Sequence, residues 1–143
     1  MKLFLSPSEI LLAVIVIGGF GIAAWQSLGG SARVSTVQVE VRPLSPTASA
    51  GKLAFDANCV ACHGKNASGT DKGPPFVDDI YNPGHHPDAS FEYAVRRGVQ
   101  QHHWRFGNMS PLPQVTDQQI AEIVTYVREL QQANGIAYRP HQM

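Results

Sequence analysis

Cys59-Val60-Ala61-Cys62-His63 is the most informative segment of the chain. The only two cysteines among 143 residues stand three positions apart, and a histidine directly follows the second. Cysteines this close together cannot brace distant parts of a fold, so we expect them to hold a cofactor or a metal ion. The chain is also rich in loops for its size, with 13 glycines, 10 prolines and only 15% charged residues. A small domain of this kind often depends on a bound group for its stability.

The C-x-x-C-H spacing of this segment is the pattern of covalent haem attachment. Two thiols on one turn can reach the two vinyl groups along one edge of a porphyrin, and the imidazole of His63 then lies below the iron. A dithiol redox pair would not need His63 and normally accompanies a βαβ pattern, which the sequence lacks. A zinc site would need two further ligands, which the later histidines can provide. The helix-loop-helix pattern around the motif favours one haem, attached at Cys59 and Cys62.

Three helices are predicted around the motif. The first runs from about Thr47 to the cysteines, and the second follows Asp88 as its N-cap and stops at Gly98. The third begins at Thr116, which forms a capping box with the glutamine three residues later, and ends at Gly135. Its apolar stripe consists of Ile120, Ile123, Val124, Val127 and Leu130. These patterns predict an all-α fold.

Irregular stretches separate the predicted helices at residues 59–87 and 99–115. Loops of this length in a compact domain need something to wrap around, and a haem would supply that core. Ahead of the first helix, alternating valines at residues 37–41 predict a short strand.

The front of the chain contains 19 residues without a formal charge, Ile10 to Leu28. As a helix this stretch spans roughly 28 Å, about the thickness of a bilayer's hydrocarbon core. A cleaved signal peptide is the alternative, because Gly30-Ser31-Ala32 offers small residues for a cleavage site. The length of the apolar run and the preceding Glu9 favour an uncleaved anchor. We therefore expect a cytoplasmic tip and transmembrane anchor at 1–28, a linker at 29–46 and a globular domain at 47–143.

Charge excludes one class of partner. Lys and Arg together number 11, as do Asp and Glu. A nucleic-acid-binding surface would need a basic excess clustered on one face. We therefore expect no nucleic-acid partner.

From about Thr47 to Gln132 the sequence resembles class I bacterial c-type cytochromes. Residues 50–64, AGKLAFDANCVACHG, are similar to the first helix and haem motif of that family. Residues 115–130, VTDQQIAEIVTYVREL, are similar to its C-terminal helix, and Gly-Pro-Pro-Phe at 73–76 to its Gly-Pro-x-Leu turn. The resemblance implies three to four helices around one covalently bound haem c, here preceded by one N-terminal transmembrane helix.

The resemblance also implies two contacts inside the domain. The carbonyl of Pro74 would accept a hydrogen bond from His63, which fixes the imidazole ring and raises its basicity. Tyr126 would cross the first helix at Gly51 and Phe55, where the glycine permits a close approach.

Met109 is the expected second axial ligand of the iron. Met1 begins the chain and Met143 ends it, whereas Met109 lies in the family's position, in a Gly-Asn-Met-Ser-Pro loop before the last helix. Ser110 departs from the more usual Met-Pro. A thioether favours reduced iron and raises the potential, although a methionine can also merely fill a core. Trp104 resembles a tryptophan whose indole N–H donates a hydrogen bond to a haem propionate in related bacterial cytochromes. The alternative is that Trp104 is an aromatic residue of the core without this role.

Two histidine pairs, His85-His86 and His102-His103, flank the second helix. Four imidazoles can form a copper or zinc site, provided that the chain after Gly98 folds back so that the pairs meet. Three other interpretations stay open. The histidines can be solvated loop residues, they can bond haem propionates, or one can replace Met109 on the iron.

The expected function is one-electron transfer. With both axial positions of the iron filled, no open site is left for a substrate, which argues against an enzyme. The resemblance implies haem attachment outside the cytoplasm, and hence a single-pass protein of a bacterial inner membrane with its cytochrome domain in the periplasm. Its partners would be a redox donor and a redox acceptor. Two alternatives are a haem subunit of a larger oxidoreductase and a copper-binding cytochrome that uses the histidine pairs.

Overall fold

The computed structural model describes residues 36–140. The predicted anchor at 1–28 lies outside the described residues, as does the first part of the predicted linker. Among the residues that are described, no helix is long and apolar enough to cross a membrane.

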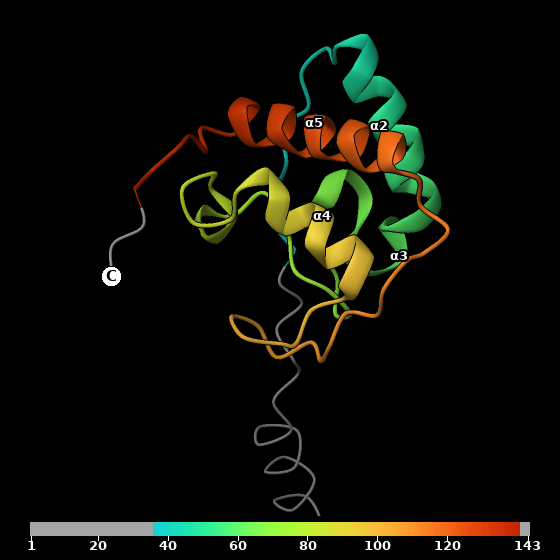
Figure 1. Ribbon diagram of the computed structural model, residues 1–143. Coiled ribbons are helices and arrows are strands. Elements are labelled where there is room, and N and C mark those ends of the chain that lie inside the picture. Colours follow the sequence, from blue (N-terminus) through green and yellow to red (C-terminus); the bar gives the residue numbers. More distant parts are fainter. Residues whose placement is uncertain (1–35, 141–143) are drawn as a thin grey trace, which may run out of the picture. The chain divides into compact units, whose positions relative to one another are not determined.

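Four α-helices form the described part of the chain (Figure 1). They are α2 (Pro46–Asn58), α3 (Val60–His63), α4 (Asp88–Arg97) and α5 (Asp117–Ala133), with short 3₁₀ helices at Lys65–Ala67 and Asp79–Tyr81. α5 packs across α2, and α4 packs against α5. Between residues 36 and 140 there is no β-strand, only an isolated bridge between Val99 and Met109. The all-α fold expected from the sequence is therefore confirmed.

The helix starts follow the local chemistry of their caps. At α2 the hydroxyl of Ser45 accepts a hydrogen bond from the Ala48 amide, at 3.1 Å. At α5 the predicted capping box between Thr116 and Gln119 is present. The predicted N-cap of α4 is wrong by one residue, because Pro87 occupies that position and makes no side-chain cap. The carboxylate of Asp88 is engaged elsewhere, in an ion pair with Arg128 of α5.

The crossing of α2 and α5 depends on a glycine and an aromatic pair. A side chain at Gly51 would overlap the backbone carbonyl of Glu122, so only glycine lets the two helices approach this closely. One turn further, the rings of Phe55 and Tyr126 meet edge to face with centroids 5.5 Å apart, and both residues are 0% exposed. The contact expected between Tyr126 and the first helix is present.

The segment at residues 37–41 is not the predicted strand. Its backbone pairs with single groups rather than with a neighbouring strand: Val37 donates to the Ser68 carbonyl at 2.8 Å, and Glu40 both donates to and accepts from the side chain of Asn134. Val37 and Val39 pack against the core. The alternating valines therefore mark an extended segment with one side packed against the core, and no strand lies beside it among residues 36–140.

Candidate functional site

His63 is buried at the end of α3, 8% exposed. Its Nδ1 lies 3.0 Å from the carbonyl oxygen of Pro74, and because a carbonyl can only accept, Nδ1 carries the proton. Burial lowers the pKa of His63, and the bond to Pro74 opposes that shift. The ring is therefore neutral, with its lone pair on Nε2, as a metal-binding imidazole requires.

The loop after α3 brings Pro74 back to this ring. The backbone amide of Gly69 donates to the His63 carbonyl at 2.7 Å, and that of Phe76 donates to the Ala67 carbonyl at 2.9 Å. Gly73 lies so close to Cys62 that an added Cβ would be 2.9 Å from its carbonyl oxygen. The ring of Phe76 then stacks on that of His63, with centroids 4.1 Å apart. The Gly-Pro-Pro-Phe sequence at 73–76 shows an aromatic residue at this turn but does not predict its contact with His63.

Cys59 and Cys62 lie on one tight turn with His63, whose amide donates to the Cys59 carbonyl at 2.9 Å. Burial raises the pKa of the Cys59 thiol to about 11, and the neighbouring Cys62 adds to the rise. A redox dithiol needs a lowered pKa, so this environment disfavours that alternative. The one group in residues 36–140 whose ligand atoms are close enough to hold a metal ion contains neither cysteine. This disfavours half of a zinc site.

A cavity of about 1070 Å³ opens beside the motif. Both cysteines, His63, Pro74 and Met109 line it, together with apolar side chains of α4 and α5. Its volume is slightly above the roughly 300–1,000 Å³ typical of ligand and cofactor sites, as a large cofactor would require. Lys72 and Arg97 are the charged side chains of the lining, which includes no carboxylate. An apolar cavity with two cations suits a flat apolar group that carries carboxylates, and a haem is such a group.

The indole N–H of Trp104 is a second feature that suits a bound carboxylate group. Its indole Nε1 is buried and makes no hydrogen bond with the residues that are described. Burial is the main cause that raises the pKa of the neighbouring Tyr81 to about 12, and the indole of Trp104 opposes this rise. An unpaired buried N–H is costly, so this donor fits the carboxylate of a bound group.

Met109 reaches the cavity from the loop between α4 and α5. Its backbone exchanges two hydrogen bonds with Val99, at 2.9 and 3.0 Å, which close the loop into a narrow arm. Gly98 has a positive φ of 75°, and a side chain there would overlap the Met109 carbonyl. The half-buried thioether of Met109 thus belongs to the same cavity as His63.

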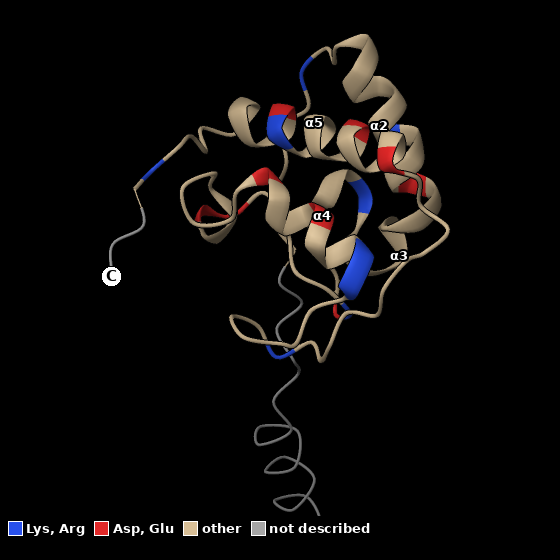
Figure 2. Cartoon of the chain, viewed as in Figure 1, with Lys and Arg blue, Asp and Glu red and all other residues tan. Residues whose placement is uncertain are grey.

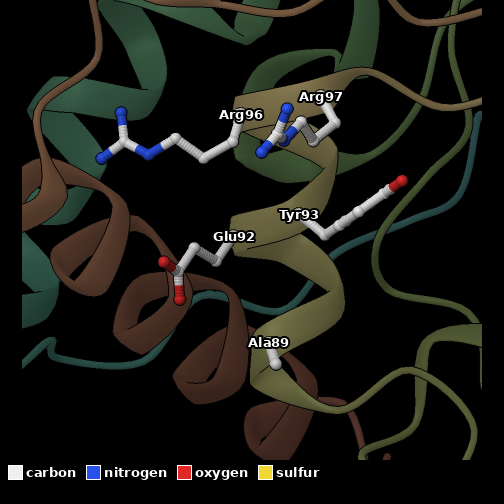
Figure 3. A pocket seen from close by; sticks show the side chains of 5 residues that line it. All are labelled: Ala89, Glu92, Tyr93, Arg96 and Arg97. Carbon is white, nitrogen blue, oxygen red and sulfur yellow. The ribbon is translucent and has the colours of Figure 1, made fainter.

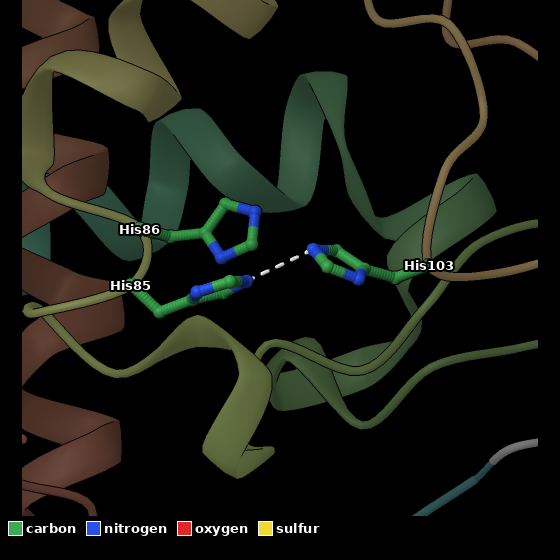
Figure 4. Close-up of side chains that lie close together, drawn as sticks. All are labelled: His85, His86 and His103. Atoms are coloured by element: carbon green, nitrogen blue, oxygen red, sulfur yellow. Dashed lines mark hydrogen bonds between the residues drawn. The ribbon is translucent and has the colours of Figure 1, made fainter. Parts of the chain in front are cut away.

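The histidine pairs meet, as a second site would require. His85, His86 and His103 offer ligand atoms that all lie within 4.8 Å of one another, and we call these three residues the histidine cluster (Figure 4). His102 is not part of the group; its Nδ1 is 2.9 Å from the carbonyl oxygen of Gln100. Burial lowers the pKa of His86 and His103.

A second depression, of about 500 Å³, lies on the outer side of α4. Its lining comes from that helix alone, with the side chains of Glu92 and Arg96 directed away from that of Tyr93 (Figure 3). It offers neither a soft ligand nor an apolar enclosure, so it is no candidate for the cofactor.

Lysine, arginine, aspartate and glutamate positions are spread over several elements of the described chain, and both blue and red segments lie along the ribbon of α5 (Figure 2). From Gly98 to Thr116, Arg105 is the one residue with a formal charge. The loop that carries Met109 and His103 is therefore close to neutral.

Comparison with known proteins gives one match. The model of the family described as Cytochrome c matches residues 48–131, more than half of the chain. Neither the curated proteins nor the solved structures gave a significant match.

Proposed function

The chain belongs to the cytochrome c family, whose members bind haem c covalently for electron transfer, and from that premise we propose a membrane-tethered periplasmic one-electron carrier. In this proposal Cys59 and Cys62 would hold the haem covalently, and His63 and Met109 would hold its iron. The observation that carries the proposal is the arrangement at His63. Its protonated Nδ1 is held by Pro74, so the lone pair of Nε2 is available in a cavity that Met109 also lines.

When bound, the haem supplies an iron centre that gains and loses one electron. The residues of this chain set its surroundings. Pro74 keeps the proton of His63 on Nδ1 and fixes the plane of the ring. The thioether of Met109 is a soft donor that favours the reduced state. Lys72 and Arg97 provide positive charge for carboxylates, and the N–H of Trp104 provides a hydrogen-bond donor.

Electron transfer without substrate chemistry follows from this ligand set. With His63 and Met109 both holding the iron, no coordination position would be left for a substrate. The proposed partners are a redox donor and a redox acceptor. A haem subunit of a larger oxidoreductase uses the same ligand set, and stable co-purification with a catalytic partner would mark it. A cytochrome that also binds a second metal is favoured by one observation, the convergence of the histidine cluster.

The proposed topology rests on the sequence. An uncharged stretch from Ile10 to Leu28 is long enough to cross the bilayer, and residues 29–46 give a linker to the cytochrome domain at 47–143. Haem attachment outside the cytoplasm then puts this domain on the periplasmic side of a bacterial inner membrane. Protease treatment of intact spheroplasts tests this topology, since only an outward-facing domain is released.

The axial ligand is tested by replacing Met109 with alanine. Iron bound to a thioether gives the oxidised protein a sulfur-to-iron charge-transfer band, so Met109→Ala is expected to abolish that band and to lower the reduction potential. Met143→Ala is the matched control and should leave both unchanged. A band that persists in Met109→Ala, or that the unaltered protein never shows, would contradict the ligand assignment.

A further inference from the structure

The histidine cluster joins two loops that are distant in sequence. His85 and His86 precede α4, and His103 follows it, 18 positions after His85. Nε2 of His85 lies 3.0 Å from Nε2 of His103, and the His86 ring centroid is 4.7 Å from that of His85 and 5.2 Å from that of His103 (Figure 4). Three imidazoles therefore face one small volume.

The hydrogen bonds of the histidine cluster fix the tautomer of His86 and link the rings of His85 and His103. Nδ1 of His86 lies 2.7 Å from the Ile80 carbonyl, which can only accept, so the lone pair of His86 is on Nε2. Between His85 and His103 one Nε2 donates and the other accepts. A backbone carbonyl on the remote nitrogen is the usual support of a metal-bound histidine, because it fixes both tautomer and ring orientation.

The backbone under His85 and His86 is held firmly. Both of their amides donate to the carbonyl of the buried Asn82, at 3.0 and 2.9 Å. From α5, the guanidinium of Arg128 donates to the carbonyls of His86, at 2.6 Å, and Tyr81, at 2.9 Å. Hydrogen bonds from the chain itself thus hold the backbone of these two ligand candidates in place.

The arm that carries His103 is closed in the same way. The amide of Gln101 donates to the Asn108 side chain, and the Gln101 side chain accepts from the Gly107 amide, both at 3.0 Å. Together with the bridge between Val99 and Met109, these bonds tie His103 to the Met109 backbone.

The donor set indicates the class of ion. Imidazole suits Zn(II), Cu(II) and Ni(II), whereas Ca²⁺ and Mg²⁺ require oxygen ligands, and the cluster contains no carboxylate. With Zn–N distances of about 2.0–2.1 Å, tetrahedral ligands lie about 3.4 Å apart. Nε2 of His85 and Nε2 of His103 are 3.0 Å apart, and the ligand nitrogens of all three residues lie within 4.8 Å of one another. Small side-chain rotations therefore bring these nitrogens to the tetrahedral spacing.

We propose that this chain binds one divalent transition-metal ion, of the zinc and copper class, through His85, His86 and His103. The fourth position is left to water or another ligand. His86 and His103 also line the cofactor cavity, so the ion adds positive charge at its edge and raises the reduction potential of the haem. Only this effect on potential rests on the proposed function, because binding of the ion does not require Met109 on the iron.

The test uses the haem-loaded full-length protein, stripped of other metals with a chelator and titrated with ZnCl₂ in a calorimeter. Zinc is the first probe because it has no redox chemistry of its own. One zinc per iron is expected by elemental analysis after desalting. His103→Ala and His85→Ala should each weaken binding by more than the roughly 10–100-fold that loss of a supporting hydrogen bond costs. His102→Ala, the matched control from the same loop, should bind zinc nearly as the unaltered protein does.

The haem potential in the presence of zinc and the zinc stoichiometry of Met109→Ala separate the metal site from the proposed haem ligation. Zinc should raise the haem potential of the unaltered protein but not of His103→Ala, and Met109→Ala should keep the 1:1 zinc stoichiometry. Absence of stoichiometric zinc, or equal losses in His102→Ala and His103→Ala, would overturn the proposal. The proposal would also fail if His103→Ala changed the haem reduction potential measured without zinc but left the zinc affinity unchanged. That result would assign His103 to a haem propionate instead of a metal ion.

Discussion

His63 and the histidine cluster use the same side chain in different settings. His63 is buried, and its orienting partner Pro74 lies only 11 positions away. The cluster is half-buried at His85 and His86, exposed at His103, and assembled from two loops on either side of α4. A ligand fixed by its own segment can be recognised from a local motif, whereas one fixed by a meeting of loops cannot.

The largest expected effect is the loss of covalent haem when the two cysteines are replaced, because the histidine cluster does not take part in that attachment. Replacing both Cys59 and Cys62 by alanine removes the two attachment points, so haem should be extracted completely by acidified organic solvent. In the unaltered protein the haem should stay with the polypeptide, as seen by haem staining after denaturing electrophoresis. Replacing both His85 and His86 by alanine is the matched control, and its haem should remain attached. Covalent haem in the double cysteine variant would refute the assignment of Cys59 and Cys62.

A smaller effect is expected at Arg128, which supports the cluster from α5. Arg128→Ala removes two hydrogen bonds to backbone carbonyls and the ion pair with Asp88, so the free energy of unfolding should fall by about 2–3 kcal/mol in urea titrations. Zinc affinity should also fall by roughly 10–100-fold, because the turn under His85 and His86 loses its support. The haem absorption spectrum should not change.

Asp88→Asn is the control for that variant. The Asp88 side chain is 68% exposed, so its ion pair contributes less than about 1 kcal/mol, and the carbonyl bonds of Arg128 stay intact. If Asp88→Asn weakens zinc binding as much as Arg128→Ala does, the ion pair rather than the carbonyl bonds supports the turn.

The smallest effect concerns the helix crossing behind the motif. Burial raises the pKa of Tyr126 to about 12 from 10.0, with Asp56 adding to the rise. The folded state thus disfavours the ionised phenol: its contribution to stability is present below pH 10 and is lost as the pH rises from 10 to 12. Tyr126→Phe should flatten this part of the stability curve while changing stability at pH 7 by less than about 1 kcal/mol. Parallel curves for both proteins would show that Tyr126 does not titrate in this range.

Local signals predicted much of the fold. The capping box at Thr116 and Gln119 and the apolar stripe behind it located α5, because caps and helical periodicity depend on residues within a few positions. The same reasoning misplaced the N-cap of α4, since the Asp88 carboxylate is engaged by Arg128, 40 positions later. It also predicted a strand at 37–41, where the chain is extended but pairs with no strand in the part of the chain that the structure describes.

At the cofactor cavity, the cysteines, His63, Pro74 and Met109 were all named from the sequence, and the structure lines one cavity with them. The stacking of Phe76 on His63 was not expected, because the sequence shows that this turn ends in an aromatic residue but not where the ring lies. Trp104 was named as a possible donor to a propionate, and only the fold shows its N–H buried and unpaired within the described part of the chain.

The sequence by itself determined that two thiols and an imidazole lie together, because these groups fall within five residues, share one turn and need no distant segment to converge. Only the tertiary structure decided which histidines of the two pairs belong together. Their meeting depends on the direction in which the arm from Gly98 to Met109 folds back, and on Arg128 of α5 holding the turn before α4. Contacts between segments this far apart are set by packing of the whole domain, and no local pattern records them.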